Sequence, residues 1–119
     1  MKNILIVDDD KDLVEALKVR LESTGNFVVN TAQNGDEALR FVQQAVPDLI
    51  ILDVMMPKLD GLTTLKMINA ITEKKIPVVI MTGKATMLKE AFQLEGAREF
   101  LIKPVNGAEL AKKAQELLA

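Results

Sequence analysis

Short uninterrupted apolar runs alternate along the chain with longer segments in which apolar residues recur every three or four positions. The run at 48–53 has four consecutive apolar residues between two aspartates. A run of this kind is typical of a strand buried on both faces, as in a parallel sheet. The pattern predicts further strands at 3–7, 27–32, 76–81 and 99–102.

The segments between these runs have the spacing of amphipathic helices. The first, at about 11–24, places Leu13, Leu17 and Leu21 on one face, and Gly25 is a natural terminator. Further helices are expected from about 35 to 45, 62 to 71, 86 to 95, and 107 to the end. The apolar residues of the helix at 86–95 are spread widely around it, which leaves one side available to a partner.

The order of these elements predicts the fold class. A strand followed by a helix occurs five times in 119 residues, with short connections. Such alternation indicates an α/β fold with a parallel sheet and helices on both faces. Because crossovers between parallel strands are right-handed, a doubly wound sandwich is the simplest topology. We expect one domain, 1–119, with no linker or repeat.

Composition excludes several classes of protein. The chain has no cysteine, histidine, tryptophan or tyrosine, so disulfides, thiolate sites and histidine catalysis within the chain are excluded. The net charge of −2 gives no basic footprint, and direct nucleic-acid binding is not expected. No apolar run approaches the roughly 20 residues of a membrane span. Without a signal-peptide pattern, and with no cysteine, we expect a cytoplasmic protein and no membrane association.

Polar side chains follow four of the five predicted strands at the point where each strand ends. They are Asp8 and Asp9 after the first strand, Asp53 after the third, Thr82 after the fourth and Lys103 after the fifth. In open parallel sheets, functional groups collect at the carboxyl ends of the strands. These five side chains are therefore expected to meet at one edge.

The residue types at this edge suit phosphoryl transfer. Three carboxylates in a small site repel one another, and a hard cation such as Mg²⁺ relieves that repulsion with oxygen ligands. Lys103 adds a compact positive charge, and Thr82 can donate its hydroxyl to a phosphate oxygen. Charge stabilisation and positioning are most of what phosphoryl transfer requires. An aspartate such as Asp53 can itself be the nucleophile and form an aspartyl-phosphate.

Four motifs together carry a family resemblance. They are Asp8-Asp9, the Leu-Asp-Val-Met-Met-Pro-x-x-Asp-Gly stretch at 52–61, Thr82-Gly83, and Phe-Leu-Ile-Lys-Pro at 100–104. Each motif is weak alone, but in this order at these strand ends they are specific. The chain resembles, over its whole length, the response-regulator receiver domains of two-component signal transduction, including the chemotaxis regulators. The resemblance implies a flavodoxin-like (βα)5 fold with strand order 2-1-3-4-5.

The resemblance also implies roles for the residues of the site. Asp53 is expected to be the phosphoacceptor. Asp8 and Asp9 are expected to hold Mg²⁺, together with Asp53 and the backbone carbonyl of Met55. Thr82 and Lys103 are expected to bind the phosphoryl oxygens.

The peptide bond between Lys103 and Pro104 matches one that is usually cis in the family. Phe100, three residues earlier, matches the family's switch aromatic. Thr82 is expected to move toward the phosphoryl group, and the Phe100 ring to turn inward. The surface of the fourth helix, fifth strand and last helix would change with them.

The resemblance implies partners as well. A sensor histidine kinase or a histidine phosphotransfer protein would donate the phosphoryl group. An output domain or a downstream protein would respond to the changed surface. The chain is expected to be a monomer or a weak phosphorylation-dependent dimer, and no enzyme beyond its own phosphoryl transfer and autodephosphorylation.

Each residue also has a simpler interpretation when it is taken alone. Asp10 and Asp12 are best explained as negative charges at a helix N-terminus. Thr82 alone suits a helix cap or turn, Lys103 a solvated lysine, and Phe100 a core residue.

Two other functions compete with the phosphorylation switch. One is a docking module that keeps the receiver fold without phosphorylation, although no key residue is missing. The other is a small phosphohydrolase, because Asp8-x-Asp10 after a strand resembles the start of the haloacid dehalogenases. That family continues with a Thr or Val and a hydrophobic residue, whereas Lys11 and Asp12 follow here, and the chain has no room for a substrate cap.

Overall fold

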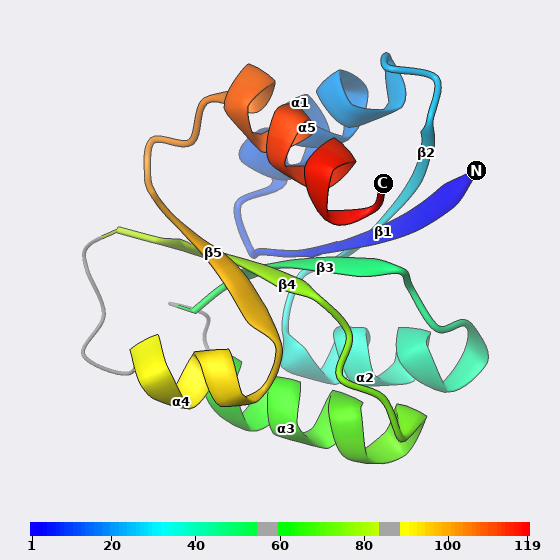
Figure 1. The fold of residues 1–119 in the computed structure, drawn as a ribbon, viewed down its shortest axis with the longest axis vertical. Helices are drawn as coiled ribbons and strands as arrows, with labels where there is room; N and C mark the ends of the chain where they lie inside the picture. Colours follow the sequence, from blue (N-terminus) through cyan, green and yellow to red (C-terminus); the bar gives the residue numbers. More distant parts are fainter. Residues whose placement is uncertain (55–59, 84–88) are drawn as a thin grey trace.

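Five parallel strands form a single sheet at the centre of the computed structural model, which describes residues 1–54, 60–83 and 89–119. The spatial order is β2-β1-β3-β4-β5, as the family resemblance implies (Figure 1). The bounds are β1 Lys2–Val7, β2 Phe27–Ala32, β3 Leu49–Asp53, β4 Val78–Thr82 and β5 Ala97–Ile102. The peptide bond between Lys103 and Pro104 is cis, as expected.

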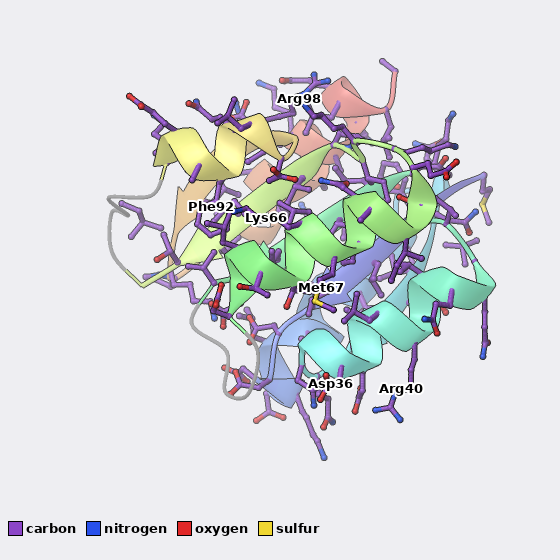
Figure 2. All side chains as sticks on the ribbon, turned by 90° about the horizontal axis from the view of Figure 1, so that it is seen from below. Asp36, Arg40, Lys66, Met67, Phe92 and Arg98 are labelled. Carbon is purple, nitrogen blue, oxygen red and sulfur yellow. The ribbon has the colours of Figure 1, made fainter. Side chains whose placement is uncertain are left out.

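Helices cover both faces of the sheet, which confirms the doubly wound architecture. Their bounds are α1 Lys11–Glu22, α2 Gly35–Gln44, α3 Gly61–Thr72, α4 Lys89–Leu94 and α5 Gly107–Leu117. The helices α1 and α5 lie on one face, and α2, α3 and α4 lie on the other (Figure 1). Charged residues such as Asp36 and Arg40 of α2 and Lys66 of α3 are on the outer side (Figure 2). None of the described helices has the length and apolar character needed to cross a membrane.

Several boundaries differ from the sequence prediction, and the largest differences are in β4 and β5. The strand predicted at 76–81 begins at Val78, because Pro77 has no N–H for the ladder and Val78 is the first to donate, to the Gly96 carbonyl. The strand predicted at 99–102 begins at Ala97, which pairs with Val78. The helix predicted at 86–95 is described only over α4, and 86–88 lie outside the described residues.

The sheet separates two hydrophobic clusters, because successive strand residues point to opposite faces. In β1, Ile4 and Ile6 belong to the cluster with α1 and α5, while Leu5 and Val7 belong to the cluster with α2 and α3. All four side chains are at most 1% exposed. Burying each such side chain stabilises the fold by about 1.5–3 kcal/mol. The two clusters therefore fix the strands whose ends carry the site.

A β-bulge in β5 decides which side chains of this edge strand face α4. Val78 pairs with Ala97, but Val79 pairs with Glu99, so Arg98 is an extra residue. In a regular strand, Ala97 and Phe100 would point to opposite faces, since they are three residues apart. Because of the bulge, both pack against the cluster that includes α4. Glu99 faces the other side, where it pairs with Lys113 of α5 at 3.4 Å.

We expect Gly96→Ala to lower the free energy of unfolding by about 2–3 kcal/mol, measured by urea denaturation. Gly96 has φ +107°, and an added Cβ would lie 2.5 Å from the Ile76 carbonyl oxygen. The matched control is Gly25→Ala, where φ is +81° but no described atom lies within 4 Å of an added Cβ. Its loss should be only about 1 kcal/mol. Equal losses in the two variants would contradict the assignment of a steric conflict to Gly96.

Candidate functional site

The carboxyl edge of the sheet brings together the side chains that the sequence placed at strand ends. Asp8 follows β1 directly, Asp53 is the last residue of β3, and Thr82 is the last residue of β4. Lys103 follows β5. Because β3 pairs with both β1 and β4, Asp53 is central in this row. The buried apolar strands hold these groups at fixed positions.

Lys103 joins two buried carboxylates. Its Nζ donates to Asp8 Oδ2 at 2.9 Å and to Asp53 Oδ2 at 3.2 Å. Asp8 is 1% exposed and Asp53 is 3% exposed. Buried carboxylates are costly unless they are paired and hydrogen-bonded, and charge-assisted hydrogen bonds are the strong kind. Lys103 is therefore a structural counter-ion of the site and not the solvated lysine of the simpler interpretation.

The environment of Lys103 raises its pKa above the ordinary value of 10.5. Burial alone would lower this pKa, but the hydrogen bond and charge of Asp8, with those of Asp53, outweigh it. A raised pKa means that the folded state binds the proton more tightly than the unfolded state. The stability that this pairing contributes is thus fully present below about pH 10.5 and is lost as the pH rises through the raised pKa.

The loop after β1 points Asp8 into the site. Asp8 Oδ1 accepts a hydrogen bond from the backbone N–H of Asp10 at 2.9 Å. Asp10 is in turn the N-cap of α1, and its Oδ1 accepts from the Leu13 N–H at 3.1 Å. The interpretation of Asp10 and Asp12 as negative charges at a helix N-terminus is confirmed, since Asp10 is the N-cap and Asp12 lies in the first turn of α1. The capping fixes the direction of the loop, so Asp8 is buried while Asp9 is exposed.

Three carboxylates are close enough to hold a metal ion. Asp8, Asp9 and Asp53 each offer one ligand oxygen, and these oxygens lie within 4.8 Å of one another. Hard oxygen donors from one or two carboxylates with open positions for water suit Mg²⁺. The described residues therefore fit a divalent cation. The predicted fourth ligand, the Met55 carbonyl, lies outside the described residues.

Thr82 and Phe100 lie on the β4–β5 side of the site. Thr82 is buried at 3% exposure, and its carbonyl accepts from the backbone N–H of Lys103 at 2.7 Å. This bond aligns the start of the loop after β5 with the end of β4. Phe100 is half-buried against the cluster on the α4 side. It is neither fully buried core nor fully exposed.

The helix-capping role of Asp60 was not predicted, because Asp60-Gly61 was interpreted from the sequence as a loop signal and as part of the matching motif. Asp60 is the N-cap of α3, with Oδ1 accepting from the Thr63 N–H and Oδ2 accepting from the Thr63 hydroxyl, both at 2.9 Å. Gly61 lies so close to the backbone after Asp53 that an added Cβ would be 3.1 Å from Val54 Cα. The sequence signal that could have identified this N-cap is an aspartate placed just before the apolar period of a helix.

We expect Asp60→Ala to lower the free energy of unfolding by about 1 kcal/mol at neutral pH. The hydrogen bonds from the Thr63 backbone and then from its hydroxyl lower the Asp60 pKa below 3.8. With a lowered pKa, the contribution is present above pH 3.8 and is lost as the pH falls through the lowered value. Urea denaturation at several pH values would measure this. The control Asp60→Asn should keep most of the stability, and a loss as large as that of alanine would contradict the capping role.

Comparison with known proteins gives a consistent result. The family model described as "Response regulator receiver domain" matches residues 4–115. The chain is 40% identical over 119 residues to the transcriptional regulatory protein CpxR of Escherichia coli K12, covering 99% of this chain and 50% of that protein. It is 36% identical over 118 residues to the alkaline phosphatase synthesis transcriptional regulatory protein PhoP of Bacillus subtilis, covering 98% of this chain and 48% of that protein.

A solved structure with the same fold is that of the chemotaxis protein CheY4 of Vibrio cholerae. It matches with a TM-score of 0.89 and 31% identity, covering 98% of each chain. The chain spans about half the length of the curated relatives it matches, which are transcriptional regulators. The strand order, the acidic edge with its lysine and these matches agree. The chain belongs to the receiver domains of two-component response regulators.

Proposed function

We propose that residues 1–119 form a receiver domain that works as a phosphorylation-operated switch, with Asp53 as the phosphoacceptor. The observation that carries the proposal is the pair of hydrogen bonds from Lys103 Nζ to Asp8 and Asp53, two buried carboxylates at the carboxyl edge. A buried carboxylate beside a fixed cation is arranged for phosphoryl transfer and not for solubility. Receiver domains are signalling switches, and we propose no enzymatic turnover beyond self-phosphorylation and autodephosphorylation.

In the proposed reaction, a carboxylate oxygen of Asp53 attacks the phosphorus atom of the donor. The new P–O bond forms as the bond to the leaving group breaks, which releases acetate from acetyl phosphate or an imidazole from a phosphohistidine. Lys103 Nζ, 3.2 Å from Asp53 Oδ2, remains near the negative charge that arrives with the phosphoryl group. Thr82 at the end of β4 would donate its hydroxyl to a phosphoryl oxygen. Positioning and charge stabilisation are the main requirements of this reaction.

We propose Mg²⁺ as the cofactor, held by Asp8, Asp9 and Asp53. The supporting observation is the proximity of their ligand oxygens, within 4.8 Å of one another. When bound there, Mg²⁺ would offset the negative charge of the three carboxylates and of the phosphoryl oxygens. The family resemblance adds the backbone carbonyl of Met55 as a further ligand.

We propose that phosphorylation changes the surface of α4, β5 and α5, and that this change controls a partner or output domain. Thr82 would move toward the phosphoryl group and Phe100 would turn inward, which shifts a pre-existing equilibrium between two states. A sensor histidine kinase or a histidine phosphotransfer protein would be the donor in the cytoplasm. Since CpxR and PhoP are named transcriptional regulators, we propose control of transcription through an output domain or partner, with this chain a monomer or weak dimer that does not itself bind DNA.

The experiment that tests the proposal is intact mass spectrometry after incubation with acetyl phosphate and Mg²⁺. We expect one added phosphoryl group, and none when the metal is removed with EDTA. Uptake that is unchanged in EDTA would contradict the metal site. No uptake from acetyl phosphate or from any phosphorylated histidine kinase tested would contradict the switch and favour a docking module.

A further inference from the structure

The ring of Phe100 is placed on the α4 side of the sheet by the bulge at Arg98. The bulge shifts the alternation of β5, so that Phe100 pairs with Ile80 and packs against the cluster on that face. The strand is at the edge of the sheet, and the ring is only half-buried. One side of the ring thus contacts the core and another remains accessible to a side chain from α4.

Lys89 of α4 lies over this ring. Its Nζ is 5.5 Å from the centroid of the Phe100 ring, within the distance of about 6 Å at which an ammonium is attracted to an aromatic face. Lys89 is three residues before Phe92, so the two side chains share one side of the helix. Phe92 is 2% exposed and anchors that side in the core (Figure 2). The stem of Lys89 therefore lies at the margin of the core, with its charge toward the exposed part of the ring.

The opposite end of α4 is tied to α3. The side-chain amide of Asn69 donates to the Glu95 backbone carbonyl at 2.8 Å and to the Glu95 carboxylate at 3.3 Å. The amide oxygen of Asn69 also accepts from the Ile76 N–H at 3.4 Å, which links this end to the entry of β4. Because Phe92 is buried and this end of α4 is tied to α3, the position of Lys89 on α4 is set independently of the Phe100 ring.

We propose that Lys89 holds the Phe100 ring in its half-buried position through this cation–π contact, and thereby biases the domain toward the resting state. The second half of the inference rests on the proposed function, in which Phe100 turns inward on phosphorylation. The contact belongs to the ring position in this structure, with Nζ 5.5 Å from the ring centroid, and an inward turn of the ring would break it. The contact would then stabilise one of the two states and not the other. Lys89 is a positioning residue that acts through Phe100 and has no contact with the phosphoryl group.

A double-mutant cycle tests the contact without any phosphodonor. Lys89→Met keeps the length of the side chain and removes its charge, and Phe100→Leu removes the ring. We expect Lys89→Met to lower the folding equilibrium constant about two- to fivefold more in the Phe100 protein than in the Phe100→Leu background, the range expected for an exposed cation–π pair. Urea denaturation of the four proteins measures this coupling.

Two further variants make the cycle specific. Lys112→Met removes an equal charge from an exposed position on α5 and should show no coupling to Phe100→Leu. Lys89→Arg keeps a cation that can lie over the ring, and it should retain the coupling. A coupling factor near one for Lys89→Met, or the same factor for Lys112→Met, would overturn the inference whether or not Asp53 accepts a phosphoryl group.

The bias on the switch is tested by titration with beryllofluoride, a mimic of the phosphoryl group, in the presence of Mg²⁺. If the inward ring and the mimic favour the same state, linkage requires Lys89→Met to bind the mimic more tightly by up to the same two- to fivefold factor. Lys89→Arg and Lys112→Met should bind as the unmodified protein does. Coupling in the cycle with unchanged affinity would overturn the bias on the switch and leave the contact established. If the unmodified protein binds no mimic, the proposed function fails, while the cycle still decides the contact.

Discussion

Replacing Asp53 with asparagine is expected to abolish phosphoryl uptake from acetyl phosphate while leaving the fold intact. An amide lacks the anionic oxygen that must attack phosphorus, so no acyl phosphate forms. The substitution preserves the shape of the side chain of a residue that is only 3% exposed, and the amide oxygen can still accept from Lys103. Intact mass spectrometry of the variant measures the loss, and urea denaturation checks the fold.

The matched control is Asp48→Asn at the opposite end of the same strand. Asp48 directly precedes β3, and its Oδ2 accepts from the backbone N–H of Asn3 at 2.8 Å. We expect a small loss of stability and normal phosphoryl uptake, because this carboxylate is on the other edge of the sheet. If the Asp53 variant took up as much phosphate as the Asp48 variant, Asp53 would not be the phosphoacceptor.

Lys103→Met is expected to lower the free energy of unfolding of the metal-free protein by about 2–3 kcal/mol at neutral pH. Removing one partner of a buried pair leaves charge without compensation, which typically costs about 3–5 kcal/mol when all partners are fully buried. The expected loss is smaller here because the Lys103 side chain is 26% exposed, whereas the side chains of Asp8 and Asp53, taken without their backbones, are 0% and 4% exposed. Urea denaturation in EDTA would measure it.

Two comparisons make the Lys103 prediction specific. Lys113→Met removes the lysine of a half-exposed ion pair with Glu99. The side chains of Lys113 and Glu99 are 30% and 35% exposed, and the loss should be at most about 1 kcal/mol. Added Mg²⁺ should restore more stability to the Lys103 variant than to the Lys113 variant, because a divalent cation can replace the missing positive charge. Equal losses for the two lysines, or no greater recovery in Mg²⁺, would show that Lys103 does not compensate the buried aspartates.

The position of the site could be predicted from the sequence because it depends on where buried strands end. An apolar run bounded by a polar residue fixes the end of a strand, as at Asp8 and Asp53, and a parallel sheet brings those ends to one edge. This prediction does not require the energies of strand pairing. For the same reason the buried helix faces were predictable, since the period of Leu17 and Leu21 alone places them in the core.

Features that depend on how distant parts of the chain pack or pair could not be predicted in this way. The bulge at Arg98 is a register shift in the pairing of β5 with β4, and no local sequence pattern indicates it. Its consequence, the placement of Phe100 beside Lys89, therefore could not be predicted either. The burial of Asp8 beside an exposed Asp9 likewise follows from the capping of α1 by Asp10. Propensity alone treats the three adjacent aspartates alike.

The central claim is that the phosphoryl group resides on Asp53, and chemical trapping tests it most directly. Borohydride reduces an acyl phosphate to a primary alcohol, which converts a phosphorylated aspartate into homoserine that peptide sequencing by mass spectrometry can locate. After treatment with acetyl phosphate and Mg²⁺, we predict homoserine at position 53 and aspartate at positions 8 and 9. Homoserine at position 8 or 9, or a phosphorylated protein with no homoserine at position 53, would contradict the account.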